Sequence, residues 1–149
     1  MRGHHESIGR YLSCLYRHTR MYLDRQLRDY GLGYGSLSFL MTLFRNDGIH
    51  QEELSRILNI DKATTARAIK RLMSLGYVIR KQDPKDRRAY RLHLTEKGLS
   101  LKPILARTSA KWSQILTAEF APEERTRVLE LLKKMSHNSV NFRESVLYK

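Results

Sequence analysis

The feature that most constrains this chain is the stretch from position 50 to 95, where three local patterns follow one another. Apolar residues recur at helical spacing over 51–58 and again over 62–75, and Asp61 and Gly76 bracket the second run. An Asp before a periodic run and a Gly after it are typical signals for the start and end of a helix. Two alternating runs, 77–82 and 90–94, then flank Asp-Pro-Lys-Asp, a turn sequence. The stretch predicts two short helices and a hairpin.

Basic residues are concentrated in the same stretch. The formal net charge of the chain is +13, and residues 62–91 contain ten Lys and Arg against two Asp, so +8 of that charge lies there. A basic helix beside a basic hairpin is the arrangement of a winged helix-turn-helix, and a polyanion is its expected partner. The alternative is a solvated basic surface without a partner. The coincidence of charge and motif favours binding to double-stranded DNA.

The flanking sequence predicts long helices. Apolar residues at three- and four-residue spacing indicate one helix over about 6–30 and a second over 36–46, separated by a segment with three glycines. After the hairpin, Thr95 caps a helix that reaches about Phe120, and Pro103 is expected to bend or interrupt it. A last helix begins at Pro122. The expected fold class is therefore mostly α with a small β-hairpin wing.

These outer helices carry more apolar surface than a small winged domain can bury. We expect them to intertwine with their copies in a symmetric homodimer, and the alternative is that they fold back as an intramolecular bundle. The expected organisation is a dimerisation helix over 1–35, a winged helix-turn-helix over 36–95 and dimerisation helices over 96–149, all in one intertwined domain.

Other features narrow the class of protein. A single cysteine, Cys14, excludes an intramolecular disulfide, and no apolar run is long enough to span a membrane. We therefore expect a soluble cytoplasmic protein. His4 and His5 lack a third ligand for a metal, and no catalytic motif is present, so we expect no metal, no cofactor and no enzymatic activity.

The second helix of the motif supplies the expected DNA contacts. A spacing of 100° per residue puts Thr65, Ala68, Ile69 and Leu72 on its inner face. On the outer face, the short side chains of Ala63 and Thr64 permit close approach to bases, and the forked guanidinium of Arg67 suits guanine. The remaining candidates, expected to contact phosphates or to flank these residues, are Lys62, Lys70 and Arg71.

The hairpin tip supplies a second set of candidates, namely Lys85, Asp86, Arg87 and Arg88. A protruding arginine is attracted to the narrow, negative minor groove of A·T-rich DNA. We expect the Asp86 carboxylate to orient the Arg88 guanidinium by a charge-assisted hydrogen bond.

The segment from Glu53 to Gly98, with D-P-K-D-R-R at 83–88 and L-H-L-T-E-K-G at 92–98, resembles the MarR family of transcription regulators. The resemblance implies a homodimer on a pseudo-palindromic operator, repression, and release by a small phenolic or other anionic ligand. It also implies that Arg67 reads a base and that Asp86 and Arg88 act as a pair at the wing tip. Ala66 and the Tyr34-Gly35-Ser36 segment depart from the family pattern, which affects individual contacts and leaves the fold intact.

The family resemblance also suggests where a small ligand and a redox signal would act. Phenolic ligands would bind between the dimer helices and the winged domain, and the residues expected there are Tyr16, Arg17, Arg20, Tyr34 and Trp112, which otherwise serve as core and surface residues. Cys14 is followed by Leu-Tyr, as in peroxide-sensing members, but it lies two residues late, and a packed bystander thiol is the favoured interpretation. The rival function is a nonspecific architectural nucleic-acid-binding protein, which would bind scrambled and genomic sequences alike.

Overall fold

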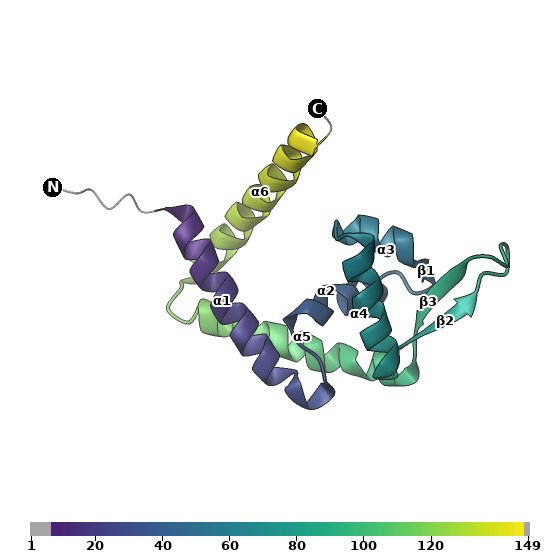
Figure 1. Cartoon of the computed structure of the whole chain (residues 1–149). Helices are drawn as coiled ribbons and strands as arrows, with labels where there is room; N and C mark the ends of the chain where they lie inside the picture. Colours follow the sequence, from purple (N-terminus) through teal and green to yellow (C-terminus); the bar gives the residue numbers. More distant parts are fainter. Residues whose placement is uncertain (1–6, 148–149) are drawn as a thin grey trace. The chain divides into compact units, whose positions relative to one another are not determined.

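The computed structural model describes residues 7–147 (Figure 1). The chain divides into two compact units, with the boundary in the sequence between residues 112 and 113. In chain order the elements are α1 (Ile8–Gln26), a 3₁₀ turn (Arg28–Tyr30), α2 (Tyr34–Leu43), β1 (Ile49–His50), α3 (Gln51–Leu58), α4 (Lys62–Ser74), β2 (Val78–Gln82), β3 (Tyr90–Leu94), α5 (Glu96–Leu116) and α6 (Pro122–Leu147). The mostly helical winged fold expected from the sequence is confirmed. No described helix is both long and apolar enough to cross a membrane.

The core of the first unit joins α2, α3, α4, the sheet and the first half of α5. Its fully buried side chains are almost all aliphatic, and the largest include Leu27, Leu40, Leu43, Leu54, Ile69, Leu72, Leu92, Leu101 and Leu105. Burial of Thr65, Ile69 and Leu72 confirms the inner face predicted for α4. On α3, where helical spacing predicts that Leu54, Ile57 and Leu58 are buried together, Leu54 is buried but Ile57 is 51% exposed.

Helix boundaries differ from the sequence prediction at several places, and the second helix, expected to reach position 46, ends at Leu43. The first helix ends at Gln26, and the 3₁₀ turn and Gly31, at φ 69°, then let the buried Leu32 return toward Leu27, whose carbonyl accepts the Leu32 amide. Periodicity alone continued the helix to Tyr30 because a 3₁₀ turn keeps side chains three apart on one side. The second helix starts two residues earlier than expected and includes Gly35. Helix α5 runs through Pro103 without interruption and ends at Leu116, before Phe120.

The wing is a three-stranded antiparallel sheet in the order β1-β3-β2. Val78 pairs with Leu94 and Gln82 with Tyr90, and the hairpin projects beyond α3 and α4 (Figure 1). Strand β1 adds Ile49 opposite Leu92. The sequence prediction missed β1 because two residues are too few to show a period-two pattern.

The junction between the sheet and α5 explains the L-H-L-T-E-K-G segment. Leu92 and Leu94 are buried, and the Thr95 hydroxyl accepts the Gly98 amide at 3.0 Å and donates to the Gly76 carbonyl at 2.6 Å. Gly98 has no room for a side chain, since an added Cβ would lie 2.2 Å from the carbonyl oxygen of Tyr77. The motif therefore caps α5 and fastens it to the turn that follows α4.

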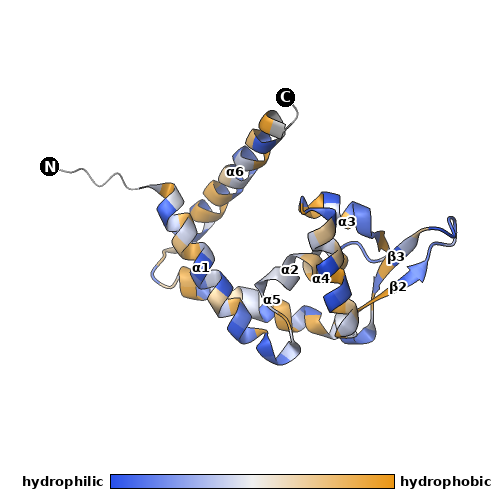
Figure 2. Cartoon of the chain, viewed as in Figure 1, coloured by the Kyte–Doolittle hydropathy of each residue, from blue (hydrophilic) through white to orange (hydrophobic). Residues whose placement is uncertain are grey.

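The second unit is dominated by α6, none of whose described side chains is buried. Hydrophobic residues recur along it (Figure 2). Those that are large and exposed are Leu129, Leu131, Leu132, Val140, Phe142 and Val146. A long helix with exposed apolar residues on its surface is marginal alone in water and is normally stabilised by packing.

Candidate nucleic-acid interface

The helix-turn-helix turn is held by local hydrogen bonds that the sequence supplies. Asn59 adopts the left-handed conformation at φ 57°, which Asn tolerates better than most residues. The Ser55 hydroxyl donates to the Ile60 carbonyl at 2.6 Å, and the Asp61 carboxylate accepts the Thr64 amide at 2.8 Å. The predicted N-cap at Asp61 is thus confirmed, and the hydrogen bond from Thr64 lowers the pKa of Asp61. These bonds fix the start of α4.

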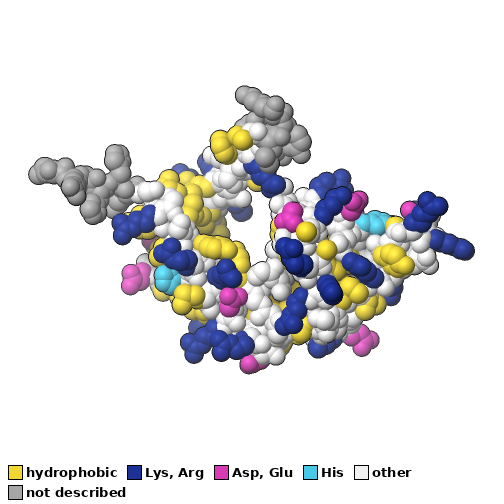
Figure 3. All heavy atoms as spheres, in the orientation of Figure 1, with side chains coloured by type: hydrophobic (Ala, Val, Ile, Leu, Met, Phe, Trp, Pro, Cys, Tyr) yellow, Lys and Arg dark blue, Asp and Glu magenta, His cyan; other side chains and the backbone are white. Residues whose placement is uncertain are grey.

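The outer face of α4 carries the residues expected to contact DNA. Lys62, Ala63, Arg67, Lys70 and Arg71 are exposed and Thr64 is half-buried. In Figure 3, Lys and Arg side chains (dark blue) gather over α4 and again at the wing tip on the same face of this unit. Basic side chains of α4 and of the wing tip therefore face the same side of this unit.

Three of the basic side chains on α4 have partners within the protein. Arg67 Nη2 donates to the Thr64 hydroxyl at 2.9 Å, Lys62 Nζ pairs with Glu52, and Arg71 Nη2 donates to the Gly31 carbonyl at 3.3 Å. The Lys62 ammonium lowers the pKa of Glu52. All three side chains remain exposed, so these contacts restrain them without removing them from the surface.

At the wing tip, Lys85, Asp86, Arg87 and Arg88 are all exposed. The Asp86 carboxylate accepts the backbone amide of Arg88 at 2.9 Å, and no ion pair joins their side chains within the described residues. This corrects the sequence expectation, in which the carboxylate orients the guanidinium. Asp86 instead shapes the backbone of the loop, because a short acidic side chain in a turn readily accepts an amide two residues on.

Asp83, expected only as a turn residue, is buried at 3% exposure directly after β2. Its carboxylate contacts Arg91 and His50, so the charge of Arg91, which counted toward the basic cluster, is paired within the protein although the side chain is 37% exposed. No local sequence pattern predicts the contact between Asp83 and His50, since His50 lies more than 30 positions earlier in the chain.

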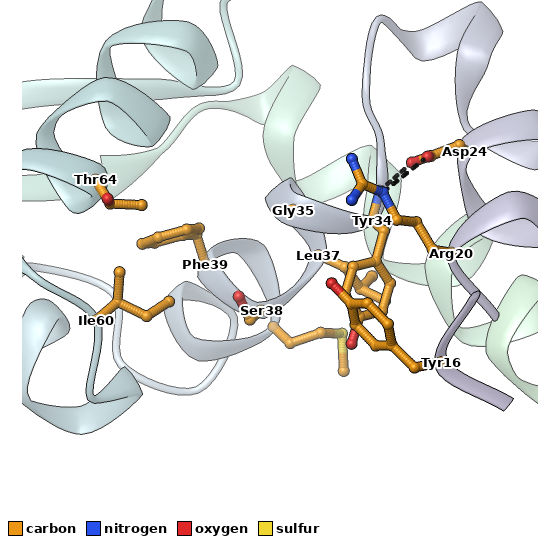
Figure 4. A pocket seen from close by; sticks show the side chains of 11 residues that line it. Tyr16, Arg20, Asp24, Tyr34, Gly35, Leu37, Ser38, Phe39, Ile60 and Thr64 are labelled. Carbon is orange, nitrogen blue, oxygen red and sulfur yellow. Dashed lines mark hydrogen bonds and ion pairs between the residues drawn. The ribbon is translucent and has the colours of Figure 1, made fainter. Parts of the chain in front are cut away.

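A pocket of about 620 Å³ lies between α1, α2 and the start of α4 (Figure 4). Three of the five residues expected at a ligand site line it, namely Tyr16, Arg20 and Tyr34. The residues that sequence reasoning missed are Asp24, Gly35, Leu37, Ser38, Phe39, Met41, Ile60 and Thr64. A volume of this size is typical of small-molecule sites, and its walls are mainly apolar with a few polar groups.

The other two expected ligand residues lie elsewhere. Trp112 stacks on Tyr22 with ring centroids 4.6 Å apart and donates its indole N–H to Thr19 at 2.9 Å, so it packs α5 against α1. Arg17 is exposed on α1 outside the pocket. Helical spacing could not separate these residues from the others, because it gives a face of α1 but not the position of α2.

One end of the pocket is polar. Asp24 Oδ1 accepts the Tyr34 amide at 2.7 Å, so a carboxylate from α1 caps α2, whose own first residue is preceded by Gly33. Arg20 Nε lies 3.6 Å from Asp24 Oδ2, and the rings of Tyr16 and Tyr34 meet edge to face at 5.5 Å. Figure 4 shows Arg20 and Asp24 at one end of the view and Ile60 and Thr64 at the other.

Within the described residues, no group of three or more His, Cys, Asp or Glu side chains is arranged to hold a metal ion. His4 and His5 lie outside the described residues. Cys14 is half-buried, and its Sγ lies 3.5 Å from His18 Nδ1.

Comparison with known proteins places this geometry in a family. The family model for MarR matches residues 33–90, which span α2 to the end of the wing loop. A MarR transcriptional regulator from Methanosarcina mazei Go1 has a similar crystal structure, with 44% identity, a TM-score of 0.84, and coverage of 91% of this chain and 97% of that one.

Two further proteins extend the comparison. The uncharacterized HTH-type transcriptional regulator YybA of Bacillus subtilis (strain 168) is 30% identical over 76% of this chain and 75% of its own length. A structure of Bordetella bronchiseptica BpsR, described as showing regulation of its DNA binding by 6-hydroxynicotinic acid, is 25% identical with a TM-score of 0.76 and covers 88% of this chain and 94% of that one. The winged unit, its basic face and these matches together make the chain a member of the MarR family, a DNA-binding transcriptional regulator.

Proposed function

We propose that this regulator is a homodimeric repressor that binds a pseudo-palindromic operator and is released by a small anionic or phenolic ligand. The single observation that carries the ligand part is the pocket, because one set of walls contains both Arg20, a partner for a carboxylate, and Thr64, which hydrogen-bonds Arg67 on the DNA-binding face. A ligand in the pocket would contact Thr64, the hydrogen-bond partner of Arg67, which is the proposed base-reading residue.

In the proposed complex, α4 enters the major groove and the wing tip lies in the adjacent minor groove. Arg67 leaves the Thr64 hydroxyl to donate two hydrogen bonds to a guanine, and Ala63 and Thr64 allow the helix to approach the bases. Lys62, Lys70 and Arg71 contact phosphates, as do Lys85 and Arg87 at the wing, while Arg88 enters the minor groove. Two such units related by a dyad require half-sites about one helical turn apart.

The proposed dimer rests on exposed apolar helix surface. Helix α6 leaves Leu129, Leu132 and Val140 among its exposed residues, and α1 exposes Ile8 and Met21. Apolar side chains repeated along one helix are the usual composition of a subunit interface. Under this proposal, residues 1–35 and 96–149 form the dimerisation part and 36–95 the DNA-binding part of one intertwined domain.

The ligand would act by competing for Arg20. The pair between Arg20 and Asp24 is long at 3.6 Å and both side chains are substantially exposed, so it contributes little stability and is easily exchanged. A ligand carboxylate would take Arg20, and an aromatic ring would pack against Tyr16, Tyr34 and Phe39. Contact with Ile60 and Thr64 would then shift the first turn of α4, which lowers DNA affinity if the ligand binds the shifted form better. The reported effect of 6-hydroxynicotinic acid on BpsR supports a ligand of this class.

A ligand titration tests the mechanism. We expect 4-hydroxybenzoate to weaken DNA binding by roughly 5- to 100-fold, which is the usual range of coupling between two sites, while the neutral 4-hydroxybenzamide has little effect. Arg20→Ala should abolish the response and leave DNA affinity without ligand unchanged, whereas Arg17→Ala, a matched change outside the pocket, should respond as the wild type does. Equal effects of acid and amide, or a full response in Arg20→Ala, would contradict the carboxylate site.

A further inference from the structure

The carboxylate of Asp83 connects three segments where the tip loop leaves β2. Asp83 Oδ1 accepts the Lys85 amide at 2.8 Å, inside the turn that leads to the tip. Asp83 Oδ2 accepts Arg91 Nε at 2.7 Å and lies 2.9 Å from His50 Nε2. Arg91 extends the network, because its Nη1 donates to the Gly48 carbonyl at 2.9 Å. One buried side chain thus touches the wing turn, β3 and the residue that precedes α3.

A second contact reaches the same end of α3. Arg80 on β2 donates through Nη2 to the Gln51 side chain, and Gln51 is the first residue of α3, directly after His50. The hairpin is therefore fastened to the start of the helix-turn-helix at two consecutive residues. Both strands of the hairpin take part, since Arg80 lies on β2 and Arg91 on β3.

The loop beyond Asp83 is itself ordered by hydrogen bonds. Asp83 N–H donates to the Ala89 carbonyl, Gln82 Nε2 donates to the Arg87 carbonyl at 2.7 Å, and Asp86 accepts the Arg88 amide. These bonds join the two sides of the loop across the tip. Its orientation relative to α4 depends on where the loop leaves the strands, and Asp83 is the first residue after β2.

The charge of Asp83 matters for these contacts. The hydrogen bond from the Lys85 amide and the Arg91 guanidinium lower the pKa of Asp83, while burial opposes them. An ionised carboxylate accepts hydrogen bonds from both Arg91 and His50, and such charge-assisted bonds are stronger than neutral ones. A side-chain amide at this position would keep the acceptor for Lys85 but would present an N–H₂ donor or a neutral oxygen to Arg91 and His50.

We propose that Asp83 is a positioning residue for DNA recognition. It fixes the angle at which the wing leaves the helix-turn-helix and so places Arg87 and Arg88 in register with α4. The inference rests on the proposed minor-groove role of the wing. It also assigns Arg91 to Asp83, as the partner that holds the carboxylate, rather than to DNA.

A double-mutant cycle tests whether Asp83 acts through the wing arginine. The variants are Asp83→Asn, Arg88→Ala and the double mutant, and the probe is a duplex with A·T-rich flanks that the wild-type protein selects from a randomised pool. We expect Asp83→Asn to weaken binding by about tenfold in the wild-type background and by less than about twofold in Arg88→Ala, because coupled residues are non-additive. Replacing the A·T flanks with G·C should remove most of the Asp83→Asn effect.

A matched control comes from the opposite end of the same sheet. Asp47 accepts the Leu94 amide at 2.7 Å and pairs with His93 at 2.9 Å, so it resembles Asp83 in chemistry but lies away from the tip. Asp47→Asn should lower thermal stability without changing the dependence on A·T flanks. Limited trypsin digestion of the free protein gives a readout without DNA, and Asp83→Asn should be cut faster after Arg87 and Arg88 than the control is.

The possible outcomes separate the inference from the function on which it rests. Wild-type affinity in Arg88→Ala would overturn the wing role and the inference with it. A normal loss in Arg88→Ala combined with an additive cycle, or with equal trypsin cleavage in the two Asn variants, would overturn the role of Asp83 alone. If Asp83→Asn does not fold, Arg91→Gln, which leaves the contacts of Asp83 to Lys85 and His50, replaces it in the cycle and must show the same non-additivity.

Discussion

Arg67 is the residue on which base recognition most depends. It is exposed on the outer face of α4, and its guanidinium rests on the Thr64 hydroxyl at 2.9 Å in the absence of DNA. Thr64 is itself half-buried and lines the pocket between α1, α2 and the start of α4. In the proposed complex Arg67 exchanges this bond for two hydrogen bonds to a guanine.

Arg67→Ala should therefore cost about 1–3 kcal/mol of binding free energy and relax the preference for one base pair in each half-site. Lys70→Ala is the control, since a phosphate contact should weaken binding to all sequences alike. Selection of each variant on a randomised duplex pool reports both quantities. An unchanged base preference in Arg67→Ala would remove Arg67 from its assigned role.

The residue scale is also where sequence reasoning failed most. Periodicity and capping rules identified Asp61, Thr65 and Arg67 correctly as cap, core and surface, because each depends on neighbours within one helical turn. The functions of Asp83 and Asp24 were missed, since their partners lie on other elements. Asp86 was assigned the wrong partner, because a side chain that bonds the backbone and one that bonds a guanidinium have the same sequence signature.

At the scale of elements, the position of the wing depends on close contacts between backbone segments. The Thr95 hydroxyl bridges the turn after α4 and the first turn of α5, and Gly98 lies against the Tyr77 carbonyl. The residues of the family signature around Gly98 therefore hold α5 against the turn that follows α4. Strand β1 and the 3₁₀ turn before α2 show the limit of sequence patterns, because elements of two or three residues are set by tertiary contacts.

Gly98→Ala should lower the free energy of unfolding by roughly 2–4 kcal/mol, because the added Cβ would meet a backbone oxygen that cannot rotate away. Gly35→Ala is the opposite case, since an added Cβ there has no neighbour within 4 Å. It should raise stability by about 0.5–1 kcal/mol through reduced backbone freedom in the unfolded chain. Urea unfolding of both variants measures the difference, and equal effects would show that Gly98 is not sterically constrained.

For the whole molecule, the exposed apolar residues of α6 are the surface whose burial would add to stability. In a monomer this surface would remain in water, whereas in a homodimer it would be buried between copies. Sequence patterns alone predicted both the helix and its apolar side, since they need only local spacing. Local spacing does not distinguish a helix that packs on a copy of the chain from one that packs within its own chain.

Sedimentation of the dilute full-length protein should give about twice the chain mass of 17.6 kDa. Leu132→Glu should shift the protein toward monomer because it buries a charge at the proposed interface, whereas Lys134→Glu, also on α6, should leave the dimer intact. Both positions are exposed in the single chain, so a monomeric protein would tolerate both changes equally. A wild-type monomer at micromolar concentration would rule out the proposed assembly.

The central claim is that α4 and the wing read DNA sequence rather than charge alone, and a competition measurement tests it most directly. The wild-type protein is titrated at one fixed, near-physiological salt concentration against an inverted repeat selected from a randomised pool and against a scrambled duplex of the same composition. Sequence-specific regulation predicts an affinity ratio of roughly 10³ or more in favour of the selected duplex. Nearly equal affinities would contradict the account and would identify the protein as a nonspecific, architectural DNA binder.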